Sequence, residues 1–134
     1  MGRVILDTSF VIAAMQANHP NHSQARTAIT AKNNDYFASV VTYSEILVGA
    51  FALEKGDSYK RSLSELFSEI VPVDVEIATV AAELRYESKK SIRLPDSLIA
   101  ATAKSLRAEL WTFDLALSQA LPAQSILYPS TNSR

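Results

Sequence analysis

Four acidic side chains stand where they could perform chemistry together. Asp7 and Asp114 each follow an apolar run that is expected to form a strand. Glu45 and Asp96 each lie in the first turn of an expected helix, Asp96 directly after a proline. Carboxylate oxygens suit the hard ions Mg²⁺ and Mn²⁺, which can lower the pKa of bound water and so promote phosphodiester cleavage. The four acids therefore indicate a metal-dependent hydrolytic site.

The acids can meet only if the segments around them form one sheet. Apolar runs predict strands, and longer periodic stretches predict helices. We expect strands over residues 4–6, 36–41, 70–73, 109–113 and 125–128, and helices over residues 10–16, 23–32, 42–53, 59–70, 75–89 and 95–106. This alternation predicts an α/β fold with a central, mostly parallel sheet flanked by helices on both faces. The crevice beyond the carboxyl ends of such strands is where the acids would converge.

Each acid also has a purely structural interpretation. Asp7, Asp96 and Asp114 could each cap a helix or form a turn. Residues 42–45 have the pattern of a capping box, in which the Glu45 carboxylate would bond back to the Thr42 amide. Independent caps need not face one crevice, whereas a metal site requires it. A metal-free cluster of carboxylates is also costly, because like charges repel and one group must then take up a proton.

Composition narrows the class of protein. The 134 residues fit one domain, expected over residues 1–128 with a short polar tail at 129–134. No cysteine is present, which excludes disulfides, thiolate zinc sites and cysteine nucleophiles. No apolar run reaches the ~18 residues of a membrane span, and the run at 4–6 is too short for a signal-peptide core, so a cytoplasmic location is expected.

Charge and histidine content limit how the chain could bind nucleic acid. The net charge is −1, so phosphate neutralisation by the whole surface is not expected. A local basic stretch at residues 88–93 is a candidate phosphate contact or a solvated helix end. His19 and His22 lie in a loop rich in Pro and Asn, and we expect them to be exposed and not to bind metal. Trp111 is expected in the core.

Four stretches of the chain resemble the motifs of the PIN-domain family, above all those of the VapC-type toxins. They are VILDTSFVIA at residues 4–13, SVVTYSEILVG at 39–49, PDSLIAATA at 95–103 and WTFD at 111–114. The order and approximate spacing match over nearly the whole chain. The resemblance implies a PIN fold and a Mg²⁺- or Mn²⁺-dependent endoribonuclease.

By position, the resemblance carries the acidic pocket of the family to four residues, namely Asp7, Glu45, Asp96 and Asp114. It implies that Asp7 and Asp96 bind the metal directly. Glu45 and Asp114 are then expected to bind it through water or to position the attacking water.

The resemblance also carries supporting positions and partners. Ser9 and Thr112 match polar positions beside the pocket that hold carboxylates or waters in place. After Asp114 the chain continues with three apolar residues where many relatives have polar and aromatic ones, so no further ligand is implied there. The family relationship further implies the toxin of a type II toxin–antitoxin pair. Its partners would be an RNA substrate, an antitoxin that inserts a segment into the active groove, and a second copy in a homodimer.

Three other classes of protein can be weighed against the sequence. A metal-dependent phosphatase or phosphoryl-transfer domain often has a second acid two residues after its aspartate nucleophile, and here that position is Ser9. A receiver-type domain would need an adjacent acidic pair, which does not follow the first strand. A non-catalytic PIN-like RNA-binding module would be expected to lack pocket acids, and here all four are present.

Overall fold

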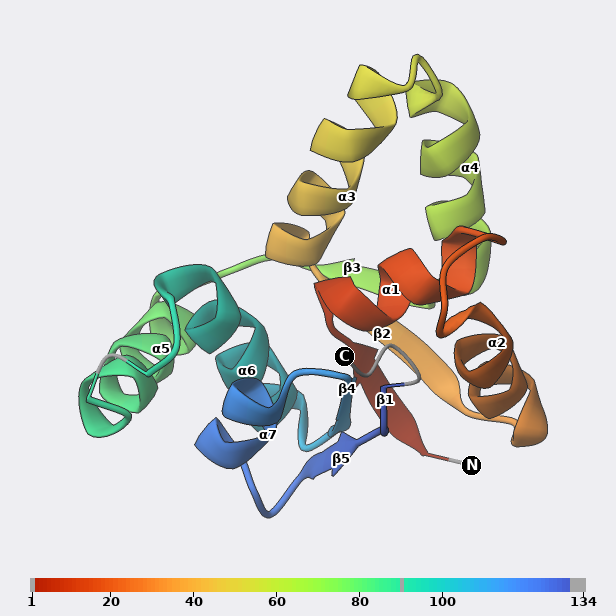
Figure 1. The fold of residues 1–134 in the computed structure, drawn as a ribbon. Coiled ribbons are helices and arrows are strands. Elements are labelled where there is room, and N and C mark those ends of the chain that lie inside the picture. The colour runs from red at the N-terminus through yellow and green to blue at the C-terminus, as the bar shows by residue number, and fades with distance from the viewer. Residues whose placement is uncertain (1, 90, 131–134) are drawn as a thin grey trace.

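The centre of the molecule is a sheet of parallel strands (Figure 1). This computed structural model describes residues 2–89 and 91–130. Its strands are β1 (Arg3–Leu6), β2 (Asp35–Ser39), β3 (Glu69–Val71), β4 (Glu109–Thr112) and β5 (Ser125–Leu127), in the order β3-β2-β1-β4-β5. The chain leaves β1 toward β2 on one side and reaches β4 on the other. The carboxyl ends of β1 and β4 therefore flank the topological switch point of the sheet.

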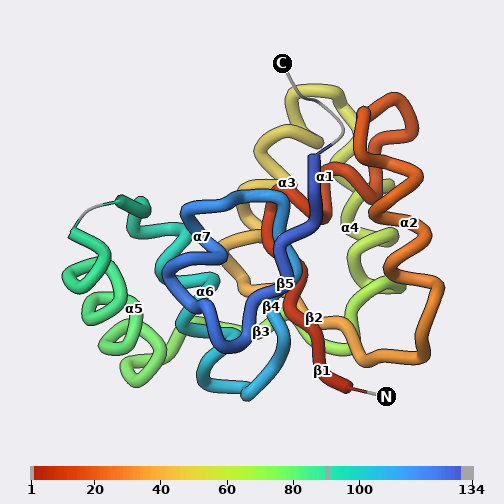
Figure 2. The backbone as a smooth tube through the Cα atoms, turned by 60° about the horizontal axis from the view of Figure 1, so that its bottom comes forward, coloured from red at the N-terminus to blue at the C-terminus, as the bar shows by residue number. Residues whose placement is uncertain are grey.

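Helices cover both faces of this sheet. In the described residues they are α1 (Thr8–Met15), α2 (His22–Ala31), α3 (Val40–Ala52), α4 (Gly56–Leu66), α5 (Val75–Glu87), α6 (Leu94–Leu106) and α7 (Leu115–Ala120). Figure 2 shows α5, α6 and α7 on one side of the strands and α1, α2 and α4 on the other. The α3–α4 hairpin projects away from the sheet (Figure 1). None of the described helices is both long enough and apolar enough to cross a bilayer.

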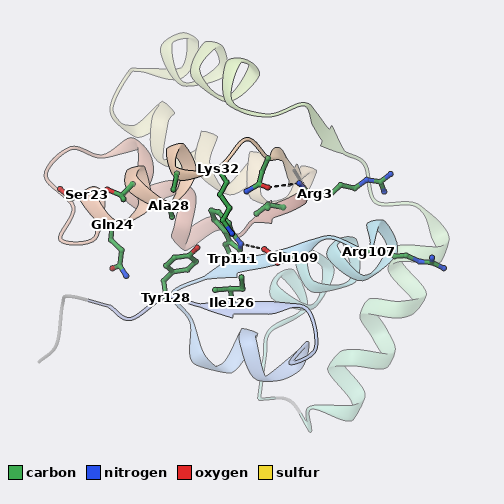
Figure 3. A pocket seen from close by; sticks show the side chains of 15 residues that line it. Arg3, Ser23, Gln24, Ala28, Lys32, Arg107, Glu109, Trp111, Ile126 and Tyr128 are labelled. Carbon is green, nitrogen blue, oxygen red and sulfur yellow. Dashed lines mark hydrogen bonds between the residues drawn. The ribbon is translucent and has the colours of Figure 1, made fainter.

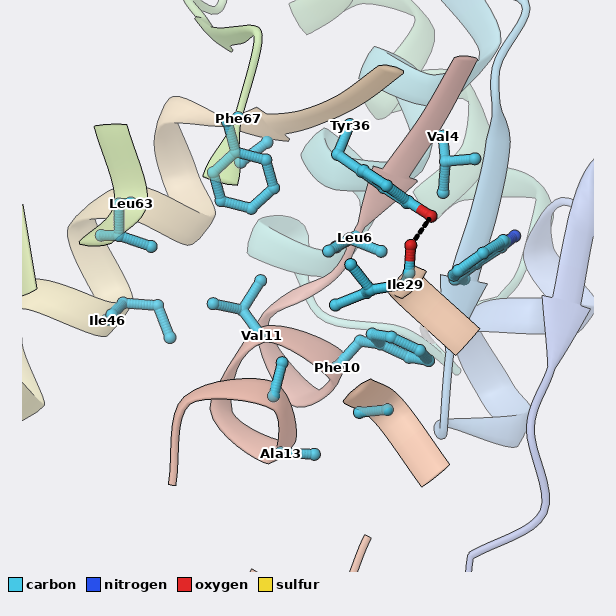
Figure 4. Close-up of a cluster of buried hydrophobic side chains, with 14 residues drawn as sticks. Val4, Leu6, Phe10, Val11, Ala13, Ile29, Tyr36, Ile46, Leu63 and Phe67 are labelled. Atoms are coloured by element: carbon cyan, nitrogen blue, oxygen red, sulfur yellow. Dashed lines mark hydrogen bonds between the residues drawn. The ribbon is translucent and has the colours of Figure 1, made fainter. Parts of the chain in front are cut away.

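Alternation along the central strand divides the core in two. Val4 and Leu6 point into a cluster with α1, α2 and α4, whereas Ile5 points into a second cluster with α5, α6 and α7. Figure 4 shows the first cluster, in which the buried Tyr36 hydroxyl donates a hydrogen bond to the Ile29 carbonyl at 2.8 Å. Trp111 belongs to this cluster and is buried, as predicted.

The predicted fold class is confirmed, while several element bounds were wrong. The second strand ends at Ser39 rather than residue 41, because the Ser39 hydroxyl accepts the Val41 amide at 3.1 Å and starts α3 there. Glu45 consequently lies in the second turn of α3, not the first. Helix α7 was missed, and α4 ends at Leu66 instead of residue 70. Of the expected tail, residues 131–134 lie outside the described part of the chain.

The predicted exposure of the two histidines was also wrong, because both are half-buried. The His22 ring nitrogen Nδ1 lies 2.9 Å from the Ala13 carbonyl oxygen, which ties α2 to α1. The His19 Nδ1 accepts the Asn21 backbone amide at 3.0 Å. Loop composition carries no information about these contacts, which is why it indicated exposure for both rings.

Shortening one side chain of β4, the strand next to the central β1, tests the placement of the core. Leu110 is fully buried, so Leu110→Ala should lower the free energy of unfolding by about 2–5 kcal/mol through lost burial and a residual cavity. The matched change Leu53→Ala removes the same atoms from a side chain that is 56% exposed. It should change the free energy of unfolding by less than about 1 kcal/mol. Urea denaturation measures both. Equal losses would contradict this placement of the core.

Candidate active site

Two of the four acids are fixed by the ends of adjacent strands. Asp7 directly follows β1 and is the N-cap of α1, and Asp114 follows β4 and is the N-cap of α7. Strands β1 and β4 pair in parallel, with Leu6 opposite Trp111. Both carboxylates therefore lie at the same edge of the sheet, at the switch point. Both acids therefore cap helices, as the structural interpretation expected, and both caps lie at the same crevice.

The Asp7 carboxylate is buried, with 3% of the residue exposed. Its Oδ1 accepts hydrogen bonds from the Ser9 hydroxyl and the Phe10 amide, both at 2.8 Å. Its Oδ2 accepts the Thr112 hydroxyl at 2.5 Å. Burial raises the pKa of Asp7, the three hydrogen bonds lower it, and the negative charge of Asp114 raises it. The net result is a pKa of about 6.

Thr112 links Asp7 to Asp114. Its hydroxyl oxygen accepts the Asp114 backbone amide at 2.8 Å while its proton goes to Asp7. The Asp114 carboxylate turns to the first amides of α7 and accepts the Ala116 amide at 2.9 Å. A single threonine thus sets the relative position of two acids that lie 107 residues apart in sequence.

Glu45 reaches the same edge from α3. Its Oε1 accepts the Thr8 hydroxyl at 2.6 Å, and the Thr8 and Thr42 hydroxyl oxygens lie 3.2 Å apart. Glu45 therefore does not form the capping-box bond to the Thr42 amide that its sequence pattern allowed. Thr8 was missed as a candidate site residue. The signal available for it was its place between Asp7 and Ser9 in the first motif.

Asp96 approaches from the opposite side of the sheet, in the first turn of α6. Burial raises its pKa, the Arg93 guanidinium lowers it, and the negative charges of Asp114 and Glu45 raise it again. The Arg93 Nε atom lies 3.9 Å from Asp96 Oδ2. Asp96 is thus close enough to Asp114 and Glu45 for their negative charges to disfavour its ionised form. Of the predicted basic stretch, Arg93 faces the site, and residue 90 lies outside the described chain.

The donor set fits a divalent cation in type and charge. All four groups are hard oxygen donors, and the raised pKa values of Asp7 and Asp96 reflect burial and mutual repulsion that a cation would relieve. In the described residues, no three acids or histidines already converge on a common point. Chelation would therefore need side-chain rotation, for which the half-buried Glu45, Asp96 and Asp114 have room.

A large cavity lies away from the four acids (Figure 3). It has a volume of about 860 Å³ and opens at the amino ends of the strands, where Arg3 and Glu109 line it. Trp111 and Tyr128 form part of its wall, and the Trp111 indole donates to Glu109 at 3.0 Å. None of the four acids lines this cavity. Its size alone does not make it the catalytic centre.

The family follows from a match that spans the four acids. The family model described as PIN domain matches residues 4–120. The chain belongs to the PIN-domain family. This confirms the resemblance drawn from the four motifs. Among curated protein sequences, none matches this PIN domain.

Solved structures similar to this PIN domain include toxins and toxin–antitoxin complexes. A toxin–antitoxin complex from Klebsiella pneumoniae is 28% identical, with a TM-score of 0.79 over 92% of this chain and 95% of the other. FitAcB from Neisseria gonorrhoeae is 24% identical, with a TM-score of 0.77 over 92% and 96%. VapC20 from Mycobacterium tuberculosis, a sarcin–ricin loop cleaving toxin, is 18% identical, with a TM-score of 0.73 over 88% and 95%. The last two likenesses establish the fold alone.

The Asp7 pKa predicts how metal-free stability depends on pH. The folded-state value of about 6 exceeds the ordinary 3.8, so protonated Asp7 stabilises the fold below pH 3.8. That contribution is lost as the pH rises through about 6, and amounts to roughly 3 kcal/mol. Urea denaturation in EDTA at a series of pH values should show this loss in the wild type. Asp7→Asn, which cannot titrate, should lack it, and parallel pH profiles for the two proteins would refute the assignment.

Proposed function

We propose that this PIN domain is a divalent-metal-dependent endoribonuclease and the toxin of a type II toxin–antitoxin pair. The observation that carries the proposal is the grouping of four carboxylates at the carboxyl edge of β1 and β4, where two of them have raised pKa values. Buried, mutually repelling acids destabilise a metal-free protein. A site of this kind is typical of function and not of stability.

We assign the residues of the site three different roles. Asp7 and Asp96 are the proposed direct metal ligands, because the family resemblance places ligands at these positions and burial destabilises the charge of both carboxylates. A bound Mg²⁺ or Mn²⁺ would neutralise phosphate charge and make water more acidic. Glu45 and Asp114 are proposed to orient the attacking water. Ser9 and Thr112 hold the Asp7 carboxylate in place through their hydroxyls.

Several features support a phosphodiester substrate. The amino ends of α1, α6 and α7 carry Asp7, Asp96 and Asp114, so partial positive helix charges surround the acids. Arg93 stands at the rim and is exposed enough to contact a phosphate. With a net charge of −1, the chain needs such local sources of positive charge. The name of VapC20 as a sarcin–ricin loop cleaving toxin supports RNA as the substrate class.

The direct test is cleavage of a mixed pool of structured cellular RNAs in Mg²⁺, Mn²⁺ or EDTA. We expect discrete cleavage in metal, none in EDTA, and a loss of at least about a hundredfold in Asp7→Asn. Asp74→Asn is the matched control. Asp74 caps α5 as Asp7 caps α1, accepting the amide three residues on at 2.8 Å, but it lies outside the site.

Asp74→Asn removes the same carboxylate charge from a helix N-cap but should keep both the cap and the cleavage, because asparagine caps a helix about as well as aspartate does. Cleavage that persists in EDTA and in Asp7→Asn would refute the nuclease assignment to these acids. Equal losses of activity in the two variants would reduce the role of Asp7 to that of a helix cap. Gel electrophoresis of the RNA products distinguishes all of these results.

A groove beside Glu45 supports the antitoxin part of the proposal. It has a volume of about 170 Å³ between α1, α3 and α4, and Ile12, Glu45, Gly49 and Tyr59 line it. Apolar side chains continue from it along the projecting hairpin, where Phe51 is 57% exposed. An exposed apolar surface that runs to a catalytic acid suits a segment of a neutralising partner. The Klebsiella pneumoniae relative is a toxin–antitoxin complex.

Gly49 offers a way to block this groove without disturbing the fold. A Cβ atom added there meets no atom within 4 Å, and leucine has a higher helix propensity than glycine. Leucine also adds no charge that could pair with Glu45 one turn away. We expect Gly49→Leu to cleave RNA at the wild-type rate but to bind the antitoxin at least tenfold more weakly. Titration of RNA cleavage with the antitoxin measures both properties. Unchanged neutralisation would exclude the groove as the binding site.

A homodimer is part of the same proposal, and its support is the family resemblance. Leu94 and Leu115 are 50% and 57% exposed and stand at the amino ends of α6 and α7. They give the protein an apolar surface beside the acidic site that is separate from the α3–α4 hairpin. Burial of such side chains between two copies would bring two acidic sites close to one another.

A further inference from the structure

A depression of about 270 Å³ lies directly beside the acidic site. It is enclosed by α1, the α1–α2 loop, the turn after β4 and the segment after β5. Its lining residues are Ser9, Ile12, His19, Asn21, Phe113 and Ser130. Ser9 belongs to both places, because its hydroxyl donates to Asp7 at 2.8 Å. Whatever occupies the depression therefore lies next to the reacting phosphate of the proposed substrate.

Phe113 gives the depression a fixed aromatic wall. Its ring is half-buried and stacks on Phe10, with centroids 5.0 Å apart and planes 15° apart. Tyr128 packs against both rings. Phe113 also stands between Thr112 and Asp114, so its backbone is held by the network of the acids. A ring that is supported from behind and open on one side suits stacking of a base.

His19 gives the depression a directed hydrogen-bond donor. The backbone around it is fixed, since its amide donates to the Gln16 carbonyl at 2.9 Å and its carbonyl accepts the His22 amide at 3.0 Å. Its Nδ1 accepts the Asn21 amide, which places the proton of the neutral ring on Nε2. Within the described chain, no residue takes a hydrogen bond from this Nε2.

We propose that this depression binds one unpaired base of the RNA, which stacks on Phe113 and accepts a hydrogen bond from His19 Nε2. The proposal rests on the nuclease function proposed above and deepens it by assigning a base-reading subsite. Stacking accepts any base, whereas a single donor favours bases that present an acceptor toward His19. The subsite would thus set which nucleotide lies beside the scissile bond.

The test separates the two nitrogen atoms of His19. His19→Asn keeps an acceptor near the position of Nδ1 for the Asn21 amide but removes the Nε2 donor. His19→Gln keeps a donor near the position of Nε2 but removes the Nδ1 acceptor. Phe113→Leu keeps an apolar wall without a ring. Thermal melting reports the fold of each variant, and only folded variants are compared for binding.

Binding is measured in EDTA, where no cleavage is expected, by fluorescence anisotropy of single-stranded RNA oligonucleotides that differ only in base. An abasic oligonucleotide of equal length is the control for phosphate contacts. We expect His19→Asn and Phe113→Leu each to weaken binding of base-containing RNA about tenfold, with His19→Gln closer to the wild type. Binding of the abasic oligonucleotide should be the same in all four proteins.

Unchanged binding in His19→Asn and Phe113→Leu, or equal weakening for the abasic oligonucleotide, would overturn the subsite. Steady-state cleavage in Mg²⁺ separates this failure from a failure of the nuclease function. A wild type that cleaves RNA, with variants that keep its KM, refutes the subsite alone. A wild type that cleaves no RNA refutes the function on which the subsite rests. A raised KM with unchanged kcat in His19→Asn is the result that the proposal predicts.

Discussion

The buried carboxylate of Asp7 is the constraint on which the rest of the site depends. A charged group with 3% exposure is tolerated only when its oxygens are hydrogen-bonded, and here α1 and β4 supply the donors. The hydrogen bond to Asp7 orients the Thr112 hydroxyl, and that hydroxyl in turn accepts the backbone amide of Asp114. The neighbouring Thr8 hydroxyl holds Glu45. The solvation requirement of Asp7 thus positions two acids, and the threonine next to Asp7 positions a third.

The fourth acid, Asp96, reaches the same edge of the sheet from the other half of the core. Helix α6 packs on the face opposite α1, yet its amino end reaches the same edge of the sheet, so Asp96 is close enough to repel Asp114 and Glu45. The fold therefore assembles charges that oppose its own stability, as functional sites commonly do. The apolar clusters on both sheet faces offset that cost.

The sequence was sufficient for what depends on local pattern. Apolar runs ending in Asp7 and Asp114 predicted parallel strands, and parallel strands predicted a shared edge. Some of what failed depended on contacts between separate segments of the chain. The Thr8–Glu45 bond joins residues 37 apart, and the His22–Ala13 contact buries a ring that its loop composition assigns to solvent. Helix α7, with six residues, is too short to show a helical period.

The central claim is that these carboxylates act together as one cation site, and crystals grown with Mn²⁺ would test it most directly. An anomalous difference map needs no assumption about substrate, partner or rate. The account predicts a peak bound by oxygen atoms of Asp7 and Asp96, with Glu45 and Asp114 around it and their side chains rotated toward it. A map with no peak at this edge of the sheet, or a peak bound only by other residues, would contradict it.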